Sequence, residues 1–257
     1  MALAIALLAG CRDDRVVVAY RPPLGRTYLY DTTVSTTTTV ELQGRAPEPP
    51  QTEVVELRAE QLVLPSATSD ETRVQILLTR PGAATRTYIA RFDRAAQLTD
   101  IERVEGIPTE ALGELGLTEI FPAAAGAPPA RGLQPGDTWA IDEAVRLPDA
   151  TQPGALTGQG RLAELGVIDG HRTARVKSST ALPLTTTVSS SNGTQRLDGT
   201  QTTDLDAAYD VSDGSVVSGT AVSVGRFAIV LSPPPGQRGD PLTGRLTVEV
   251  RTTIQRR

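Results

Sequence analysis

The chain has 257 residues, a formal net charge of -5, and one residue each of cysteine, histidine, methionine and tryptophan. A single cysteine excludes a disulfide framework, and one cysteine with one histidine leaves almost no basis for a Cys/His metal site. The 25 basic residues are outnumbered by 30 acidic ones and form no basic cluster, so we expect no nucleic-acid partner. We also expect no metal ion and no cofactor. The length allows one large β domain or two small ones, and either can bury a sizeable core.

The N-terminus carries the most specific pattern. Residues 1–10 form a short apolar run that ends in small residues, and Cys11 follows directly before charged residues. Ten residues are about half the length of a membrane-spanning helix, so the run resembles the apolar region of a signal peptide. Leu8, Ala9, Gly10 and Cys11 resemble the lipobox of bacterial lipoproteins. The resemblance implies that residues 1–10 are removed and that Cys11 becomes the lipidated first residue of the mature chain.

A lipidated N-terminus predicts a protein of the bacterial cell envelope, anchored to a membrane on its extracytoplasmic side. Residues 11–24 would then be the lipidated cysteine and a short tether, reaching roughly 40 Å at about 3.3 Å per residue. No Lys or Arg precedes the apolar run, although signal peptides carry a basic region there. A start site further upstream or inefficient export would account for this departure. The alternative of a buried N-terminal element with an incidental cysteine stays open.

Apolar and polar residues alternate with a period of two along several segments, as in antiparallel strands with one wet face. The clearest segment is 246–251, and segments 73–78 and 88–93 follow the same pattern. Threonine runs at 36–39 and 185–187 also fit strands, because a β-branched residue with a hydroxyl suits a solvated strand face. We therefore expect a mainly β protein.

Four pairs of residues that tolerate positive φ predict hairpin turns, all in the second half of the chain. The pairs are Asp169-Gly170, Asn192-Gly193, Asp198-Gly199 and Asp213-Gly214.

One short helix is expected from about Pro108 to Ile120, with proline in its first turn and Glu110 where the helix dipole favours an anion. This helix and a Pro/Ala/Gly-rich connector occupy residues 106–135. They separate a first β unit, over residues 25–105, from a second, over residues 136–257.

The two units open alike. Gly25–Asp31 reads Gly-Arg-Thr-Tyr-Leu-Tyr-Asp, and Gly136–Asp142 reads Gly-Asp-Thr-Trp-Ala-Ile-Asp. An aromatic-Asp pair follows late in each half, at Phe92-Asp93 and at Tyr209-Asp210. We interpret this as an internal repeat that predicts two β units of similar plan sharing one curved sheet. The alternative, that strand-turn-strand segments generally look alike, stays open.

This pattern of a Gly-x-Thr-aromatic opening, a re-entry over Leu133–Trp139 and a late Tyr-Asp-x-x-x-Gly hairpin is similar to uncharacterised envelope lipoproteins. Those in turn resemble the periplasmic lipoprotein-carrier and lipid-carrier half-barrels. The resemblance implies a curved antiparallel sheet that wraps a helix over an apolar cavity. No position matches a functional motif of those carriers, so the ligand-binding residues stay unknown.

The sequence offers little catalytic chemistry. The only histidine, His171, lies beside a predicted turn and is expected to be an exposed hairpin residue rather than a catalytic base. The carboxylates nearest one another, Asp142-Glu143 and Asp204 with Asp206, are expected to be solvated. Trp139 is expected to anchor the core rather than stack on a ligand. We therefore expect no enzyme.

Two functions stay open. The first is a lipid-anchored carrier or binding module, in which the concave face of the sheet holds an acyl chain or another apolar ligand. The second is a structural or assembly lipoprotein that displays loops to an envelope protein and binds no small molecule. A cavity lined by Leu, Ile, Val and Ala would favour the first, and a filled core would favour the second.

Overall fold

The computed structural model describes residues 15–82, 85–94, 98–105, 128–145, 154–190, 193–234 and 239–257. The lipobox and the expected helix from Pro108 to Ile120 lie outside the described residues.

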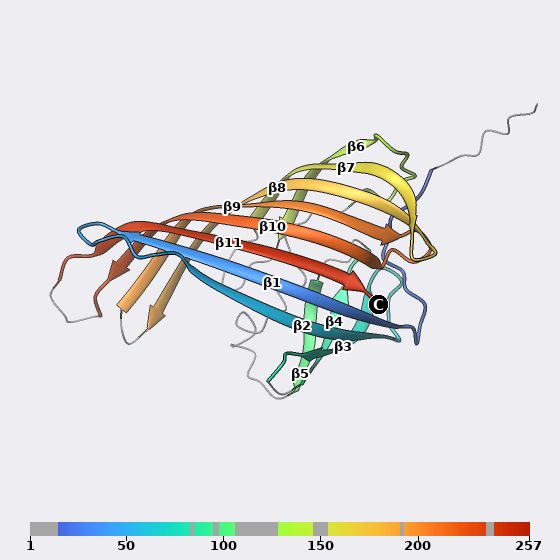
Figure 1. Ribbon diagram of the computed structural model, residues 1–257, viewed down its shortest axis with the longest axis horizontal. Helices are drawn as coiled ribbons and strands as arrows, with labels where there is room; N and C mark the ends of the chain where they lie inside the picture. The colour runs from blue at the N-terminus through green and yellow to red at the C-terminus, as the bar shows by residue number, and fades with distance from the viewer. Residues whose placement is uncertain are drawn as a thin grey trace, which may run out of the picture.

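The described chain is a single antiparallel sheet of eleven strands in the order β5-β4-β3-β2-β1-β11-β10-β9-β8-β7-β6. The expectation of a mainly β protein with a curved antiparallel sheet is confirmed. The sheet stays open, with β5 and β6 as its edges, and forms a half-barrel in which both edges curl under the long central strands (Figure 1). The strands are β1 (Thr27–Leu42), β2 (Gln51–Leu64), β3 (Thr72–Thr79), β4 (Arg86–Phe92), β5 (Leu98–Glu105), β6 (Thr138–Val145), β7 (Gly154–Ile168), β8 (His171–Ser190), β9 (Gly193–Asp210), β10 (Val216–Ser232) and β11 (Leu242–Arg256).

The two halves of the chain join through β1 and β11, the first and last strands. These strands pair antiparallel over most of their length, from Tyr30 opposite Arg256 to Leu42 opposite Gly244. Strands β1 to β5 then lead outward to one edge, and β6 to β11 lead back from the other. The two halves therefore form one continuous sheet, as the repeat predicts.

The two opening turns also have matching hydrogen bonds. The N–H of Gly25 donates to the carbonyl of Val63 at 3.0 Å, and the N–H of Gly136 donates to that of Leu162 at 2.8 Å. Both glycines have positive φ, at 74° and 95°. The sequence likeness between the two halves thus corresponds to the same turn at the start of β1 and of β6.

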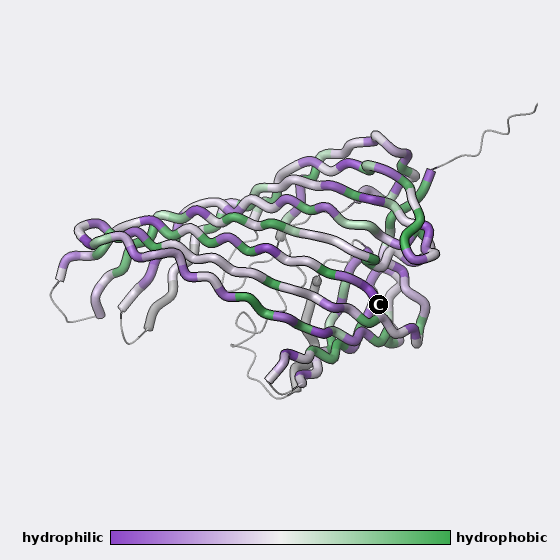
Figure 2. Tube along the Cα trace, in the orientation of Figure 1, coloured by the Kyte–Doolittle hydropathy of each residue, from purple (hydrophilic) through white to green (hydrophobic). Residues whose placement is uncertain are grey.

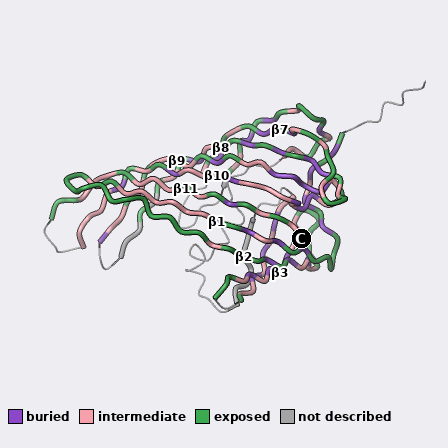
Figure 3. The backbone as a smooth tube through the Cα atoms, viewed as in Figure 1, coloured by how far each residue is buried: buried purple, intermediate pink, exposed green. Residues whose placement is uncertain are grey.

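Side chains on one face of the sheet, here called the inner face, build the core. One buried cluster covers β1 to β4 and a second covers β6 to β9. Buried residues gather where the sheet edges curl inward, whereas the far ends of the long strands are half-buried or exposed (Figure 3). Along the strands, hydrophobic and hydrophilic residues follow one another closely, as a sheet with one apolar face requires (Figure 2).

The prediction that residues 11–24 form a tether is wrong for the second half of this segment. Val16 and Val18 belong to the core cluster of β6 to β9, Tyr20 belongs to that of β1 to β4, and Pro22 is also buried. Val16 and Leu133 exchange backbone hydrogen bonds at 2.8 Å, and the N–H of Tyr20 donates to the carbonyl of Arg94 at 2.6 Å. The reason is the alternating apolar pattern of this segment, which packs like a strand.

Glycines on the inner face allow the sheet to bend sharply. A Cβ on Gly199 of β9 would collide with the carbonyl oxygen of Arg226, and one on Gly244 of β11 would collide with that of Glu41. Glycine at such positions permits the close backbone approach that strand bends need. The hairpin turn expected at Asp198-Gly199 is therefore wrong, because Gly199 serves a bend inside a long strand. The turns at Asp169-Gly170 and Asp213-Gly214 are confirmed, with φ of 50° at Asp169, 79° at Gly170 and 71° at Gly214.

Substitution of Gly199 by alanine is expected to lower the free energy of unfolding by about 1–3 kcal/mol, because the backbone must shift to accept the methyl group. Gly166→Ala in β7 is the matched control, since a Cβ there meets only the Thr173 hydroxyl at 3.7 Å. Urea unfolding of both variants measures the difference. Equal stability of the two variants would contradict a close backbone approach at Gly199.

Candidate functional site

The far ends of β8 to β11 and β1 carry apolar side chains beyond the two core clusters. In the strand register, Val40 lies opposite Leu246, Leu246 opposite Phe227, Phe227 opposite Gly199, and Gly199 opposite Leu184. This row crosses five neighbouring strands. Its four large side chains are half-buried. We call the inward-facing side chains of this region the distal apolar face: Val40, Leu184, Leu197, Phe227, Leu246 and Val248.

Phe227 is the largest side chain on the distal apolar face. Its ring lies over two glycines, because a Cβ on Gly225 would collide with the ring and one on Gly199 would lie 2.8 Å from Cδ1. Because these glycines have no side chains, the aromatic ring lies in close contact with the backbone of the sheet. The surface above it is therefore formed by apolar atoms of several strands rather than by one protruding side chain.

A strip of hydroxyl side chains crosses the inner face between the core and the distal apolar face. Thr180, Thr203 and Ser223 lie side by side on β8, β9 and β10. The Thr203 and Ser223 hydroxyl oxygens are 2.9 Å apart, and Thr180 Oγ1 donates to the Thr203 carbonyl at 3.4 Å. Gln201 Nε2 donates to Thr203 Oγ1 at 3.4 Å. The strip offers hydroxyl and amide groups at one end of an otherwise apolar surface.

The outer face of the sheet is polar. Arg175 donates to both oxygens of Asp206 at 2.7 and 2.9 Å and to Glu164 at 3.1 Å, and Lys177 pairs with Asp206 at 3.1 Å. The hydrogen bonds from Arg175 lower the pKa of Asp206. Asp204 is exposed on the same face. Asp206 therefore holds surface ion pairs, and both carboxylates face away from the distal apolar face.

The other pair of neighbouring carboxylates identified in the sequence, Asp142 and Glu143, does not form a common site either. Asp142 and Glu143 are neighbours in β6 and point to opposite faces, with Asp142 exposed and Glu143 half-buried. In the residues that the structure describes, no group of three or more His, Cys, Asp or Glu side chains could hold a metal ion.

Trp139 packs in the core cluster of β6 to β9, with 9% of its surface exposed. A Cβ on Gly160 of β7 would collide with its ring, so the indole lies flat against that glycine. The expected role as a core anchor is confirmed. Its Nε1–H has no hydrogen-bond partner within the described residues.

A polar cleft of about 430 Å³ lies at the opposite end of the sheet, where the chain ends. His171 Nδ1 is 2.9 Å from Asp210 Oδ2, and Arg256 donates to the same oxygen at 3.1 Å. Asp210 and Arg256 are deeply buried, with 5% and 8% of their side-chain surfaces exposed. His171 is 41% exposed, as a hairpin residue, but it is also held by a buried carboxylate. The sequence missed this pairing because His171 and Asp210 are far apart along the chain.

Four tyrosines pack near this end, and burial raises the pKa of each. For Tyr209 the pKa rises to about 12. A raised folded-state pKa gives stability that is complete below the unfolded value of 10.0 and is lost as the pH rises toward the folded value. The others are Tyr20, Tyr28 and Tyr30.

The free energy of unfolding is therefore expected to fall above pH 10, by about 1 kcal/mol for each buried tyrosine by pH 11. Urea unfolding at pH 8, 10 and 11 measures the loss. Tyr209→Phe should lose less stability than the wild type over this range, because one ionisable group is removed. A free energy that stays level to pH 11 would contradict the burial of these hydroxyls.

The predicted lipidation site, Cys11, and the lipobox residues Leu8, Ala9 and Gly10 lie outside the described residues. Within the described part of the chain, no helix is long and apolar enough to cross a membrane. The chain matches no protein-family model, and a search of curated proteins finds no significant sequence match.

Proposed function

We propose that this protein is a membrane-anchored, non-enzymatic lipoprotein of the bacterial cell envelope, and that its distal apolar face binds a lipid acyl chain or another apolar ligand. The observation that carries the proposal is the row of half-buried apolar side chains across β1, β11, β10 and β8, beyond the core. A contiguous apolar surface that a folded domain leaves only half-buried is typical of a binding site.

The dimensions of the distal apolar face fit an extended chain. Residues 223–231 of β10 span about 27 Å at 3.4 Å per residue, which accommodates a long acyl chain laid along the strands. The five strands are spaced about 4.8 Å apart and give the face room for more than one chain. Each methylene group removed from water contributes about 0.8 kcal/mol, so contact along this length is sufficient for binding.

The hydroxyl strip supports a ligand with one polar end. Thr203 and Ser223 lie where an acyl chain on the distal apolar face would meet the core. An ester or carboxyl group placed there could accept a hydrogen bond from the half-buried Ser223 hydroxyl, which lies 2.9 Å from that of Thr203.

Catalysis has little support from the groups near the polar cleft. The nearby hydroxyls of Ser212 and Ser215 donate to Asp210 and Asp213 at 2.6 Å rather than to His171. A serine nucleophile needs its hydroxyl directed to a base rather than to a carboxylate of its own turn. These serines cap turns, and the distal apolar face lies at the other end of the sheet.

Energy transfer from Trp139, the only tryptophan, tests ligand binding. The full chain with Cys11→Ser is titrated with a dansyl-labelled fatty acid, and saturable quenching of Trp139 fluorescence is expected. Phe227→Gln should weaken binding by about tenfold, because it replaces the central apolar side chain. Ala228→Gln is the matched control, since the next residue is exposed on the outer face and its variant should bind like the parent.

Absence of saturable quenching in the parent protein would favour the second function, a structural lipoprotein that binds an envelope protein. Equal binding by Phe227→Gln and Ala228→Gln would place the ligand elsewhere than on the distal apolar face.

A further inference from the structure

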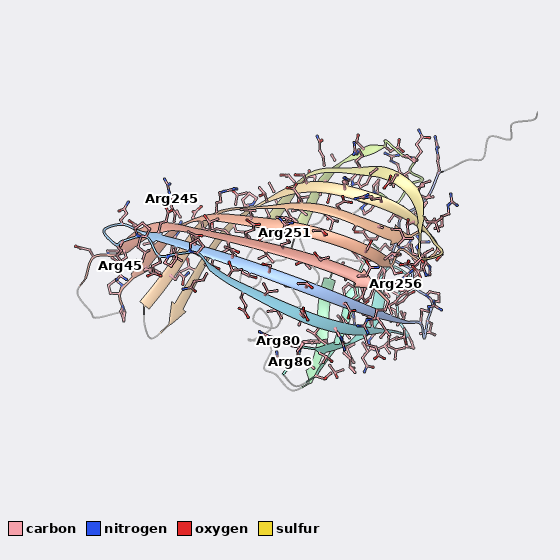
Figure 4. All side chains as sticks on the ribbon, in the orientation of Figure 1. Arg45, Arg80, Arg86, Arg245, Arg251 and Arg256 are labelled. Atoms are coloured by element: carbon pink, nitrogen blue, oxygen red, sulfur yellow. The ribbon has the colours of Figure 1, made fainter. Side chains whose placement is uncertain are left out.

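The polar cleft lies at the end of the sheet opposite to the distal apolar face. A ligand bound in this cleft would therefore be separate from the proposed lipid ligand. The walls of the cleft come from the turn before β1, the start of β8, the end of β9 and the end of β11. Figure 4 places Arg256 at this end, far from Arg45 and Arg245 at the distal end. Its polar lining residues are Arg26, His171, Asp210, Ser212, Asp213 and Arg256.

The two carboxylates of the cleft are already saturated by donors. Asp210 Oδ1 accepts from the N–H and hydroxyl of Ser212 at 3.0 and 2.6 Å, while Oδ2 receives His171 and Arg256. Asp213 Oδ1 accepts from the N–H and hydroxyl of Ser215 at 2.8 and 2.6 Å, and its Oδ2 accepts from the Tyr28 hydroxyl at 2.7 Å. All four carboxylate oxygens have partners, so the cleft has little capacity left for a cation.

The N–H groups of the two arginines that line the cleft are not all used in hydrogen bonds. The guanidinium groups of Arg26 and Arg256 lie 6.0 and 5.8 Å from the centre of the Tyr28 ring. Among the residues that the structure describes, Arg256 donates through one nitrogen to Ser215 and through another to Asp210, which leaves other N–H groups of its five without a partner. Arg26 has no carboxylate within 4.0 Å in the described part of the chain.

The imidazole adds a third polar group. Since Nδ1 donates to Asp210, the other ring nitrogen, Nε2, is left for the solvent-exposed side of His171. The remaining titratable groups facing this cluster are the hydroxyls of Tyr28 and Tyr30, which stay neutral at physiological pH.

We propose that this cleft binds a phosphate-type anion, held by Arg26, Arg256 and His171. Two guanidinium groups and an imidazole suit a tetrahedral oxyanion, because arginine forks donate to two oxygens at once. A cleft of about 430 Å³ is larger than an inorganic ion, so the anion can belong to a larger molecule. A dissolved phosphate and a lipid headgroup present the same oxyanion chemistry.

The single histidine allows a direct test. The full chain with Cys11→Ser, labelled with ¹⁵N and ¹³C, is titrated with inorganic phosphate, with ionic strength held constant by chloride. The His171 ring signals are expected to shift saturably. Arg26→Gln should weaken binding about tenfold or more through loss of a charge-assisted hydrogen bond. Arg45→Gln, an exposed arginine at the distal end, is the matched control and should bind phosphate like the parent.

Vesicle flotation separates the two sources of the anion. If the ligand is a headgroup, vesicles of phosphatidylglycerol bind the protein, those of phosphatidylcholine do not, and Arg26→Gln abolishes the difference. If the ligand is a dissolved phosphate, the saturable shift occurs with inorganic phosphate and the vesicles give no such difference. Neither response, or equal responses from Arg26→Gln and Arg45→Gln, would overturn the proposal. Because Phe227 is distant along the sheet from this cleft, Phe227→Gln should leave phosphate binding unchanged, so this result is independent of the lipid site.

Discussion

Replacement of Arg256 by alanine is expected to lower the free energy of unfolding by about 3–5 kcal/mol, because it leaves Asp210 buried without its main counter-charge. Arg256 and Asp210 are both more than nine-tenths buried, and their side chains are 3.1 Å apart. The same guanidinium donates to Ser215 Oγ at 2.6 Å. Arg256 thus connects the last residues of β11 to the turn between β9 and β10, and its loss disconnects both.

Arg251→Ala provides the control, because Arg251 lies on the same strand but is exposed and lies 4.0 Å from Glu249. Its loss should change stability by about 0.5 kcal/mol or less. Urea unfolding measures both variants. The double variant Asp210→Asn with Arg256→Met should recover part of the loss, since neither charge is then buried alone. Similar stability of Arg256→Ala and Arg251→Ala would contradict a buried ion pair.

The Asp210 pair also predicts sensitivity to acid. Burial opposes ionisation of Asp210, but the hydrogen bonds from Ser212 and Arg256 outweigh it and lower the pKa of Asp210. A lowered folded-state pKa gives stability that is present above the unfolded value of 3.8 and is lost as the pH falls through the folded value. The stability gap between wild type and Arg256→Ala should therefore narrow below about pH 4.

Substitution of Cys11 by serine is expected to move the protein from the membrane fraction to the soluble fraction. The physical reason is that acyl chains contribute about 0.8 kcal/mol per buried methylene, and two chains are needed for stable anchoring. Expression in a bacterial host, followed by fractionation and labelling with a palmitate analogue, measures the change.

Arg12→Lys is the matched control for the anchor, because it changes the neighbouring residue and leaves the lipobox intact. It should stay on the membrane and incorporate label like the wild type. If Cys11→Ser stays membrane-bound, or the wild type takes up no label, the lipoprotein assignment fails.

Local sequence pattern predicted the strands well, because each depends on side-chain alternation within a few residues. Segment 246–251 lies in β11, with Leu246, Val248 and Val250 half-buried on the inner face and Glu249 and Arg251 exposed on the other. The threonine runs at 36–39 and 185–187 likewise lie inside β1 and β8. The internal repeat predicted that the two halves share one sheet. Its two copies, Gly25–Asp31 and Gly136–Asp142, form the same turn at the start of β1 and of β6.

Contacts between residues that lie far apart in the sequence could not be predicted from local sequence pattern. The segment from Val16 to Tyr20 alternates like a strand, but its short length and its place before the first turn made it look like a tether. Gly199 follows an aspartate, as in a hairpin, but its function depends on the carbonyl of Arg226, a partner brought close only by the folded sheet. The contact of His171 with Asp210 and Arg256 likewise depends on three strand ends meeting.

Native mass spectrometry is the most direct test of the central claim, that the distal apolar face holds an apolar ligand. The full chain with Cys11→Ser is purified without detergent from the soluble fraction of a bacterial host, weighed under native conditions and then extracted with organic solvent. The account predicts a stoichiometric lipid adduct that extraction removes and that Phe227→Gln reduces. A clean mass of the bare chain, unchanged after incubation with envelope lipids, would contradict it and would point to a protein partner instead.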